Sequence, residues 1–104
     1  MSPERATDAF DALADPHRRA ILAMLSKEPH AVNELAERLP ISRPAVSRHL
    51  RLLKEAELVV DEPQGTRRLY RLHDEGAARV KAYLEEVWGD AFRRFRLMAE
   101  NIDE

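Results

Sequence analysis

The chain has 104 residues, which is enough for one domain with a single modest core. It contains no cysteine, and this excludes disulfides, thiolate metal sites and thiol redox chemistry. The longest apolar run, residues 20–25, is far shorter than the ~20 residues that span a bilayer, and the N-terminus lacks an apolar signal core. We therefore expect a soluble, cytoplasmic protein.

The formal net charge of -2 hides an uneven distribution along the chain. Residues 1–41 carry five basic and seven acidic side chains, residues 42–71 carry seven and four, and residues 72–104 carry five and eight. A protein that coats nucleic acid without selectivity is expected to be basic as a whole. A basic middle segment in an acidic chain instead favours a protein that docks one basic face into a groove.

Three short helices are predicted in the first 41 residues. The first should end near Asp15, because the proline that follows it disfavours helical geometry. Asp15 and Pro16 then suit the N-cap and first position of the second helix. The third helix is expected over residues 32–39, with a frayed start, because Ala31 at its cap position has no side-chain acceptor.

A fourth helix is predicted from its cap, Ser42, to about Ala56, and with the third it forms a helix-turn-helix over residues 32–56. One stripe of this helix is apolar and can be anchored in a core: Val46, Leu50 and Leu53. The start and opposite face of the helix are cationic and hydroxylated, and they supply the main candidate DNA-binding residues: Ser42, Arg43, Pro44, Ser47, Arg48 and Arg51.

These candidate residues have different expected roles. Arg43 and Arg48 are the candidates for reading bases, because arginine can make bidentate hydrogen bonds to guanine in the major groove. Pro44 either touches a thymine methyl group or only stiffens the start of the helix. The remaining three are expected to contact phosphates: Ser42, Ser47 and Arg51.

The helical pattern ends after Leu58, and residues 59–72 are predicted to form a β-hairpin, or wing. Its turn is expected at residues 63–65. At least one of Arg67 and Arg68 should reach the DNA backbone or the adjacent minor groove. Before the wing, Glu57 stands where a glycine would end the fourth helix more comfortably, so we expect a left-handed backbone there.

The last helix is predicted over residues 75–101, with Asp74 as its cap. Its apolar stripe is wider and more aromatic than one small core can bury, which indicates a contact between two copies of the chain. A pocket for a small hydrophobic effector is the alternative use of the aromatic group. With residues of the first helix, the stripe gives the candidate dimer interface: Phe10, Leu13, Leu84, Trp88, Phe92 and Phe95.

The histidines carry no expected metal site. His49 lies at the border of the cationic face, where packing or hydrogen bonding is the favoured role. His17, His30 and His73 are scattered along the chain, without a nearby ligand cluster or the spacing of a metal motif. No phosphate-binding glycine loop, nucleophile elbow or carboxylate pair is present either, so we expect neither an enzyme nor a cofactor.

The predicted fold is therefore mostly α with a β-hairpin wing (α+β), a winged helix-turn-helix in the order α-α-α-α-β-β-α that assembles as a homodimer. We expect a single domain over residues 1–104. Within it, residues 1–14 and 75–104 would form dimerisation helices, residues 32–56 the helix-turn-helix and residues 59–72 the wing.

Four segments, in this order and spacing, resemble the arsenical-repressor (ArsR) family of bacterial winged-helix regulators: residues 15–22, 34–36, 42–50 and 65–72. The resemblance implies a homodimeric transcriptional regulator, usually a repressor, that binds an inverted repeat in a promoter. The chain departs from the family pattern at Ala31 and Glu57. It also lacks the cysteine pair near the third helix and the histidines on the last helix, so the usual metal sites of the family are not carried over.

Two alternatives remain open from the sequence. The winged-helix scaffold also supports protein–protein interaction modules that do not bind DNA. The cationic and polar character of the exposed positions on the fourth helix favours DNA over a protein partner. Neither the identity of an effector nor the choice between repression and activation follows from these residues.

Overall fold

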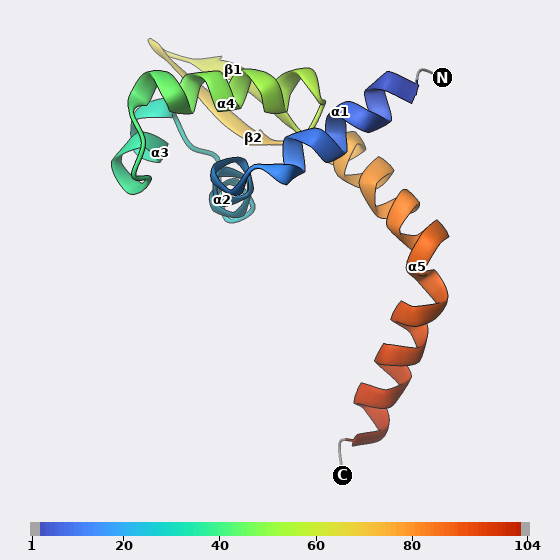
Figure 1. The fold of residues 1–104 in the computed structure, drawn as a ribbon. Helices are drawn as coiled ribbons and strands as arrows, with labels where there is room; N and C mark the ends of the chain where they lie inside the picture. Colours follow the sequence, from blue (N-terminus) through green and yellow to red (C-terminus); the bar gives the residue numbers. More distant parts are fainter. Residues whose placement is uncertain (1–2, 103–104) are drawn as a thin grey trace.

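The computed structural model describes residues 3–102, and the elements occur in the predicted order (Figure 1). Four helices precede a two-stranded antiparallel hairpin, and a long helix follows it. Their bounds are α1 Pro3–Ala14, α2 Pro16–Leu25, α3 Val32–Arg38, α4 Arg43–Glu55, β1 Val59–Gln64, β2 Arg67–Leu72 and α5 Asp74–Ile102. The predicted class, a mostly helical winged helix-turn-helix, is confirmed.

The starts of α2 and α4 are fixed by the predicted caps. Oδ1 of Asp15 accepts hydrogen bonds from the backbone N–H of His17 at 2.8 Å and of Arg18 at 3.1 Å. Oγ of Ser42 accepts one from the N–H of Ala45 at 3.2 Å. These bonds satisfy backbone donors that have no partner inside the helix, and a cap of this kind contributes about 1 kcal/mol.

The start of α3 is better supported than the sequence indicates. Ala31 has no side-chain acceptor, as expected. Its backbone N–H, however, donates a 3.0 Å hydrogen bond to Oε1 of Glu34. This bond is the largest cause that lowers the pKa of the Glu34 carboxyl. The prediction of a frayed start did not take Glu34 into account. Its side chain ties the first turn of α3 to Ala31, the residue before the helix.

Of the two predictions for the segments on either side of the wing, one is confirmed and one is wrong. Glu57 has the predicted left-handed backbone, with φ of 62°. Asp74 is not the cap of α5, because the helix begins there and Nδ1 of His73 accepts the hydrogen bond from the N–H of Gly76 at 3.2 Å. Asp74 instead lies in the first turn, where its charge interacts favourably with the helix dipole.

The wing spans residues 59–72 as predicted, but its first strand is longer than predicted and its turn is shorter. Pro63 and Gln64 belong to β1, pairing with Arg68 and Arg67, so the turn is reduced to Gly65 and the following threonine. A proline is tolerated here because β1 is an edge strand. Gly65 has φ of 65°, a backbone geometry that tight hairpin turns require and that glycine adopts without strain.

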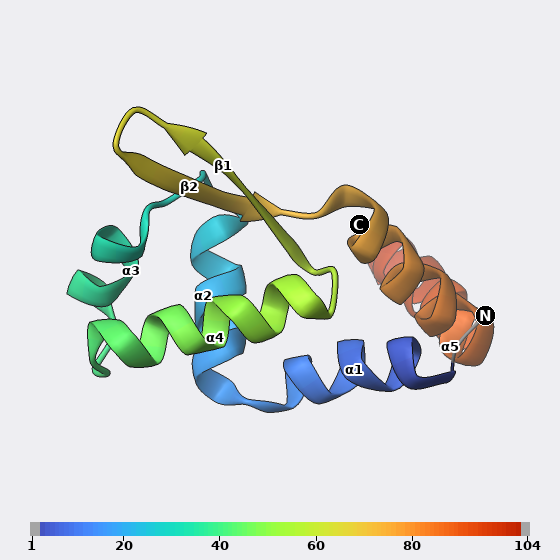
Figure 2. The ribbon, with the colours of Figure 1, turned by 90° about the horizontal axis from the view of Figure 1, so that it is seen from above.

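The core lies where α2, α3, α4 and the base of the wing meet (Figure 2). Its fully buried side chains are Ile21, Leu35, Val46, Leu50, Leu53 and Val59. Burial of each such side chain stabilises the fold by about 1.5–3 kcal/mol. The three residues predicted to anchor the fourth helix are all in this set, so the orientation of α4 is fixed by its own apolar stripe.

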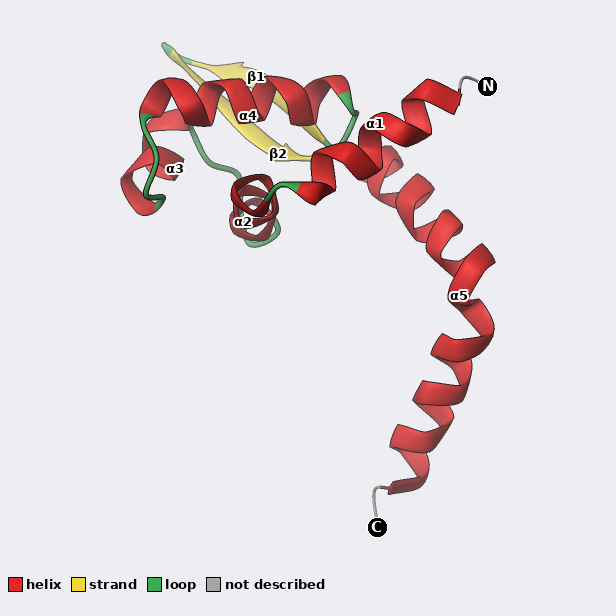
Figure 3. Ribbon diagram, in the orientation of Figure 1, coloured by secondary structure: helices red, strands yellow, loops and turns green. Residues whose placement is uncertain are grey.

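Helix α5 leaves the rest of the molecule after its first turns and runs away from the wing and from α2 to α4 (Figures 1 and 3). The radius of gyration is 16.3 Å, larger than the ~13 Å of a compact domain of about 100 residues. Within residues 3–102, no helix has the length and apolar character needed to cross a membrane.

Candidate nucleic-acid interface

Helix α4 separates a buried face from an exposed cationic face. Its buried residues are Val46, His49, Leu50 and Leu53. The six candidate DNA-binding residues at the start of this helix and on its other face are all exposed: Ser42, Arg43, Pro44, Ser47, Arg48 and Arg51. The helix is thus held rigidly by one face while the other is open to a ligand.

The arginines of this face differ in their partners. Arg43 and Arg48 form no ion pair with any of the described side chains, so both guanidinium groups keep all their donors for another molecule. Nε of Arg51 lies 4.0 Å from a carboxylate oxygen of Glu55, and both side chains are 65% exposed. An exposed pair of this kind contributes little and is readily exchanged for a phosphate contact.

The candidate arginines of the wing are exposed but paired. Nη2 of Arg67 donates a 3.3 Å hydrogen bond to Oε2 of Glu34 on α3. Nε of Arg68 donates a 2.6 Å hydrogen bond to Oδ2 of Asp61 across the hairpin. In both arginines the contact leaves other N–H donors of the guanidinium group unused.

The structure brings the wing and helix α4, the second helix of the helix-turn-helix and hereafter the recognition helix, together around one polar hollow. This hollow has a volume of about 450 Å³, and Arg43 lines it together with Thr66, Arg67 and Arg68. Cations from two separate elements therefore face the same space. Arg48 and Arg51 do not line this hollow and extend the cationic surface along α4 instead.

Asp61 is a residue that sequence reasoning missed. Its side chain is only 5% exposed and lies between Arg68 and Lys54, whose Nζ is 2.9 Å from Oδ1. Burial raises the pKa of this carboxyl. The hydrogen bonds from Lys54 and Arg68 lower it by more than burial raises it, so the pKa lies below the ordinary value. The signal available in the sequence covered only the contact with Arg68, because that residue is a diagonal cross-strand neighbour of Asp61 in the hairpin and such neighbours can reach one another.

The candidate dimer residues fall into two groups. Phe10 and Leu13 on α1 and Leu84 on α5 are half-buried, and the Phe10 ring packs against Tyr83 with a centroid distance of 4.9 Å. The aromatic side chains further along α5 are open to solvent, with exposed fractions of 48% for Trp88, 50% for Phe92 and 73% for Phe95. The aliphatic side chains beside them are exposed as well: Val87, Leu97 and Met98.

An apolar groove of about 490 Å³ runs between α5 and the body of the protein. Leu13, Leu84 and Phe92 line it, together with Leu22 and Leu58 of the core region. Groove and exposed aromatic side chains form one continuous apolar surface through Phe92. A contiguous exposed apolar surface on a small chain marks a site of interaction.

The histidines are not all as isolated as the sequence indicates. His49 is buried, with 7% of its surface exposed, and its Nδ1 lies 3.3 Å from Nη1 of Arg18, which agrees with the predicted packing and hydrogen-bonding role. The expectation that His17 has no ligand cluster nearby is wrong, because it lies beside Asp15 and His49. His30 is buried and pairs with Glu34, at 3.3 Å between Nδ1 and Oε1.

Comparison with known proteins supports the same architecture. A family model described as a helix-turn-helix domain matches residues 13–62. The HTH-type transcriptional regulator Rv2034 of Mycobacterium tuberculosis is 47% identical over 102 residues, which cover 97% of this chain and 95% of that protein. The arsenical resistance operon repressor of Escherichia coli is 33% identical over 94 residues, covering 89% of this chain and 80% of that protein.

Solved structures give a consistent result. A crystal structure of an ArsR family transcriptional regulator superposes with a TM-score of 0.74 at 34% identity, covering 86% of this chain and 95% of the other. The homodimeric winged helix-turn-helix DNA-binding domain Mb0332 of Mycobacterium bovis, a possible ArsR-family regulator, gives 0.69 at 28% identity, covering 88% and 84%. Fold, motif order and sequence identity agree, and the chain belongs to the ArsR family of winged helix-turn-helix transcriptional regulators.

Proposed function

We propose that this regulator binds a promoter operator as a homodimer and represses transcription there. The observation that carries the proposal is the exposed cationic face of α4, whose opposite face is locked in the core. A helix presented in this way fits the major groove, which admits an α-helix and displays a distinct donor and acceptor pattern for each base pair. The wing adds cations beside it, around the shared polar hollow.

Base reading is assigned to Arg43 and Arg48. Both are exposed, free of ion pairs with described side chains, and able to donate two parallel hydrogen bonds to guanine. Phosphate contacts are assigned to Ser42, Ser47 and Arg51 and to the wing arginines Arg67 and Arg68. Pro44 sits in the first turn of α4, where it stiffens the helix start and can touch a thymine methyl group.

Dimerisation is supported by the apolar surface of α5. The exposed aromatic side chains and the groove beside them would leave a single chain with a large apolar area in water, which pairing of two chains removes. A homodimeric structural neighbour supports the same assembly. In this proposal residues 1–14 and 75–104 form the dimer interface, residues 32–56 and 59–72 contact DNA, and residues 1–104 act as one domain.

A two-fold dimer determines the form of the operator. Its two α4 helices would enter successive major grooves about 34–36 Å apart, so the operator should be an inverted repeat with half-sites one helical turn apart. Repression is the favoured outcome because the relative from Escherichia coli is named a repressor. A dimer bound over a promoter represses by excluding polymerase.

The proposal is tested by fluorescence anisotropy with DNA from upstream of the gene, against a scrambled duplex of the same composition. We expect affinity for the specific duplex at least ~10³-fold above that for the scrambled one, with strong salt dependence. Equal affinity for both duplexes would refute operator recognition. Retention of a stoichiometric protein partner without DNA binding would favour the alternative, a protein-interaction module.

A further inference from the structure

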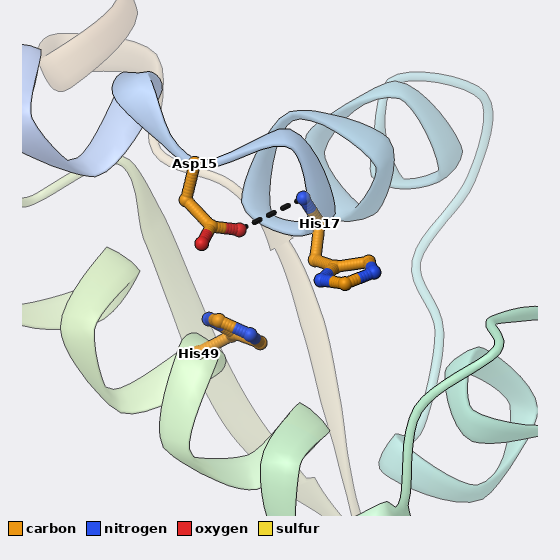
Figure 4. Close-up of side chains that lie close together, drawn as sticks. All are labelled: Asp15, His17 and His49. Carbon is orange, nitrogen blue, oxygen red and sulfur yellow. Dashed lines mark hydrogen bonds between the residues drawn. The ribbon is translucent and has the colours of Figure 1, made fainter.

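Three side chains able to bind a metal ion meet where α2 begins, on the side of α4 that faces the core. They are Asp15 between α1 and α2, His17 in the first turn of α2, and His49 on α4. One donor atom from each lies within 4.8 Å of the others. Figure 4 shows the Asp15 carboxylate above the His49 ring, with the His17 ring beside them.

Each of the three positions is fixed by an independent structural feature. Asp15 is held by its capping bonds, both of which use Oδ1, so Oδ2 remains for another partner. His49 is buried on the anchored face of α4. His17 is half-buried, and its ring centroid lies 6.0 Å from that of His49. Donors bound to one zinc ion lie closer together than 4.8 Å, so metal binding requires the His17 ring to move toward the other two donors.

The donor chemistry selects the class of ion. Two imidazoles and one carboxylate make the three-ligand set of many zinc sites, with a fourth position left for water. Imidazole suits zinc, copper, nickel and iron, whereas magnesium and calcium prefer oxygen ligands only. The structure shifts the pKa of two of the donors toward the form that binds a metal ion. Hydrogen bonds led by that of the Arg18 N–H lower the pKa of Asp15, and burial lowers that of His49.

Arg18 is the competitor for this position. Its Nη1 lies 3.3 Å from Nδ1 of His49, where a metal ion could also bind. The same guanidinium is anchored elsewhere, by Nε to the carbonyl of Ala12 at 2.9 Å and by Nη2 to that of Asp11 at 3.2 Å. Because the guanidinium group is planar and rigid, these two contacts also hold Nη1 beside Nδ1 of His49. A metal ion would therefore bind His49 through Nε2, or Arg18 would give up a carbonyl contact. Its charge reduces the affinity for a metal ion without closing the site.

We propose that Asp15, His17 and His49 form a binding site for a divalent transition-metal ion of the zinc type, which links the first turn of α2 to the recognition helix. The site lies on the core side of α4, away from the face assigned to DNA. It is unrelated to the cysteine and last-helix positions at which the sequence resemblance would have placed a metal. The proposal does not depend on DNA binding and is tested without DNA.

The test is calorimetric titration of the full chain with zinc chloride near pH 7.5, with magnesium chloride as the comparison ion. We expect one zinc per chain and no heat of binding with magnesium. Cobalt(II) should give the intense visible absorption of a tetrahedral site. Absence of stoichiometric zinc binding by the wild-type chain would overturn the proposal.

His17→Asn removes one ligand at a half-buried position and should lower zinc affinity at least ~10-fold, since loss of even an outer-shell partner costs that much. His73→Asn is the matched control. It removes another half-buried histidine, and asparagine can keep the cap that His73 provides for Gly76. Zinc binding by His17→Asn as tight as that of His73→Asn would refute the assignment.

A readout on the wild-type chain removes any dependence on the folding of the variants. The imidazole resonances of His17 and His49 should shift on addition of zinc in nuclear magnetic resonance spectra. Those of His30 and His73, which lie outside the cluster, should stay in place. Shifts confined to His30 or His73 would show that the metal binds elsewhere and would contradict the proposal.

Discussion

Nε of Arg68 on β2 donates a 2.6 Å hydrogen bond to Oδ2 of Asp61 on β1. The other carboxylate oxygen lies 2.9 Å from Nζ of Lys54 in the last turn of α4. The acid is 5% exposed, while both cationic side chains are 54% exposed. One nearly buried carboxylate thus joins the wing to the recognition helix and holds two cations at the surface.

Replacing this carboxylate tests its contribution to stability. Asp61→Asn keeps the size of the side chain but removes its charge, and with it both charge-assisted bonds. We expect a loss of about 1–3 kcal/mol in the free energy of unfolding, measured by urea denaturation. Glu62→Gln is the control, because Glu62 is 63% exposed and lies 3.5 Å from Arg71, an arrangement worth less than about 1 kcal/mol. Equal losses in the two variants would contradict the proposed role of Asp61.

The same residue predicts a dependence of stability on pH. Burial raises the pKa of Asp61, but the bonds from Lys54 and Arg68 outweigh burial, so its pKa in the folded chain lies below 3.8. A lowered pKa in the folded state means that the ionised form stabilises the fold above about pH 4, and that this contribution is lost as the pH falls through the folded pKa. Urea denaturation between pH 7 and pH 3 should show a shallower acid loss in Asp61→Asn than in the wild type. Identical slopes would show that Asp61 does not couple protonation to folding.

Gly76 in the first turn of α5 is required by a backbone contact. A Cβ added there would lie 1.7 Å from the carbonyl oxygen of Glu57, the residue with the left-handed backbone. Gly76→Ala must push α5 away from the α4–β1 connection and should cost on the order of 1–3 kcal/mol, measured by thermal or urea denaturation. In Gly89→Ala the new Cβ has Nη1 of Arg93 at 3.6 Å as its neighbour, an ordinary contact. That variant should gain about 1 kcal/mol from helix propensity, so a destabilised Gly89→Ala or a neutral Gly76→Ala would refute this account.

The assigned DNA roles predict different effects for two arginines of α4. Arg48→Ala should lose about 1–3 kcal/mol on the specific operator only, and its preference at one base pair should relax. Arg51→Ala should weaken binding to all duplexes alike and reduce the slope of log affinity against log salt by about 1. Anisotropy titrations at several salt concentrations separate the two outcomes. Lys27→Ala, an exposed cation between α2 and α3, serves as the control and should leave both quantities unchanged. Identical behaviour of Arg48→Ala and Arg51→Ala would remove the distinction between base and phosphate contacts.

The proposed dimer predicts the effect of a charge on the exposed aromatic surface. Trp88→Asp would place an unpaired carboxylate in the seam between two chains, at a cost of several kcal/mol. We expect a monomer in light scattering at micromolar concentration, and a matching fall in operator affinity. Ala82→Asp introduces the same charge at an exposed position off the apolar stripe of α5 and should remain dimeric. A wild-type chain that is monomeric, or a dimeric Trp88→Asp, would contradict the interface.

Most element boundaries could be predicted because their causes are local. The prolines and caps at Asp15 and Ser42 act within one helical turn, and the apolar stripe of α4 identifies its buried face through spacing alone. The left-handed Glu57 was predictable for the same reason. The errors arose where a neighbour changed the outcome: His73 caps α5 in place of Asp74, and Pro63 is accommodated in a strand that has only one partner.

The sequence by itself determined the order of the elements, the anchored and exposed faces of α4 and the basic character of the surface offered to DNA, since periodicity and charge are properties of neighbouring residues. Only the tertiary structure decided that Asp61 holds Lys54 and Arg68, that Arg43 shares a hollow with the wing, and that His17 meets His49. These relationships join residues that are distant along the chain. Their distances depend on how the helices pack around the core, and no local pattern encodes that packing.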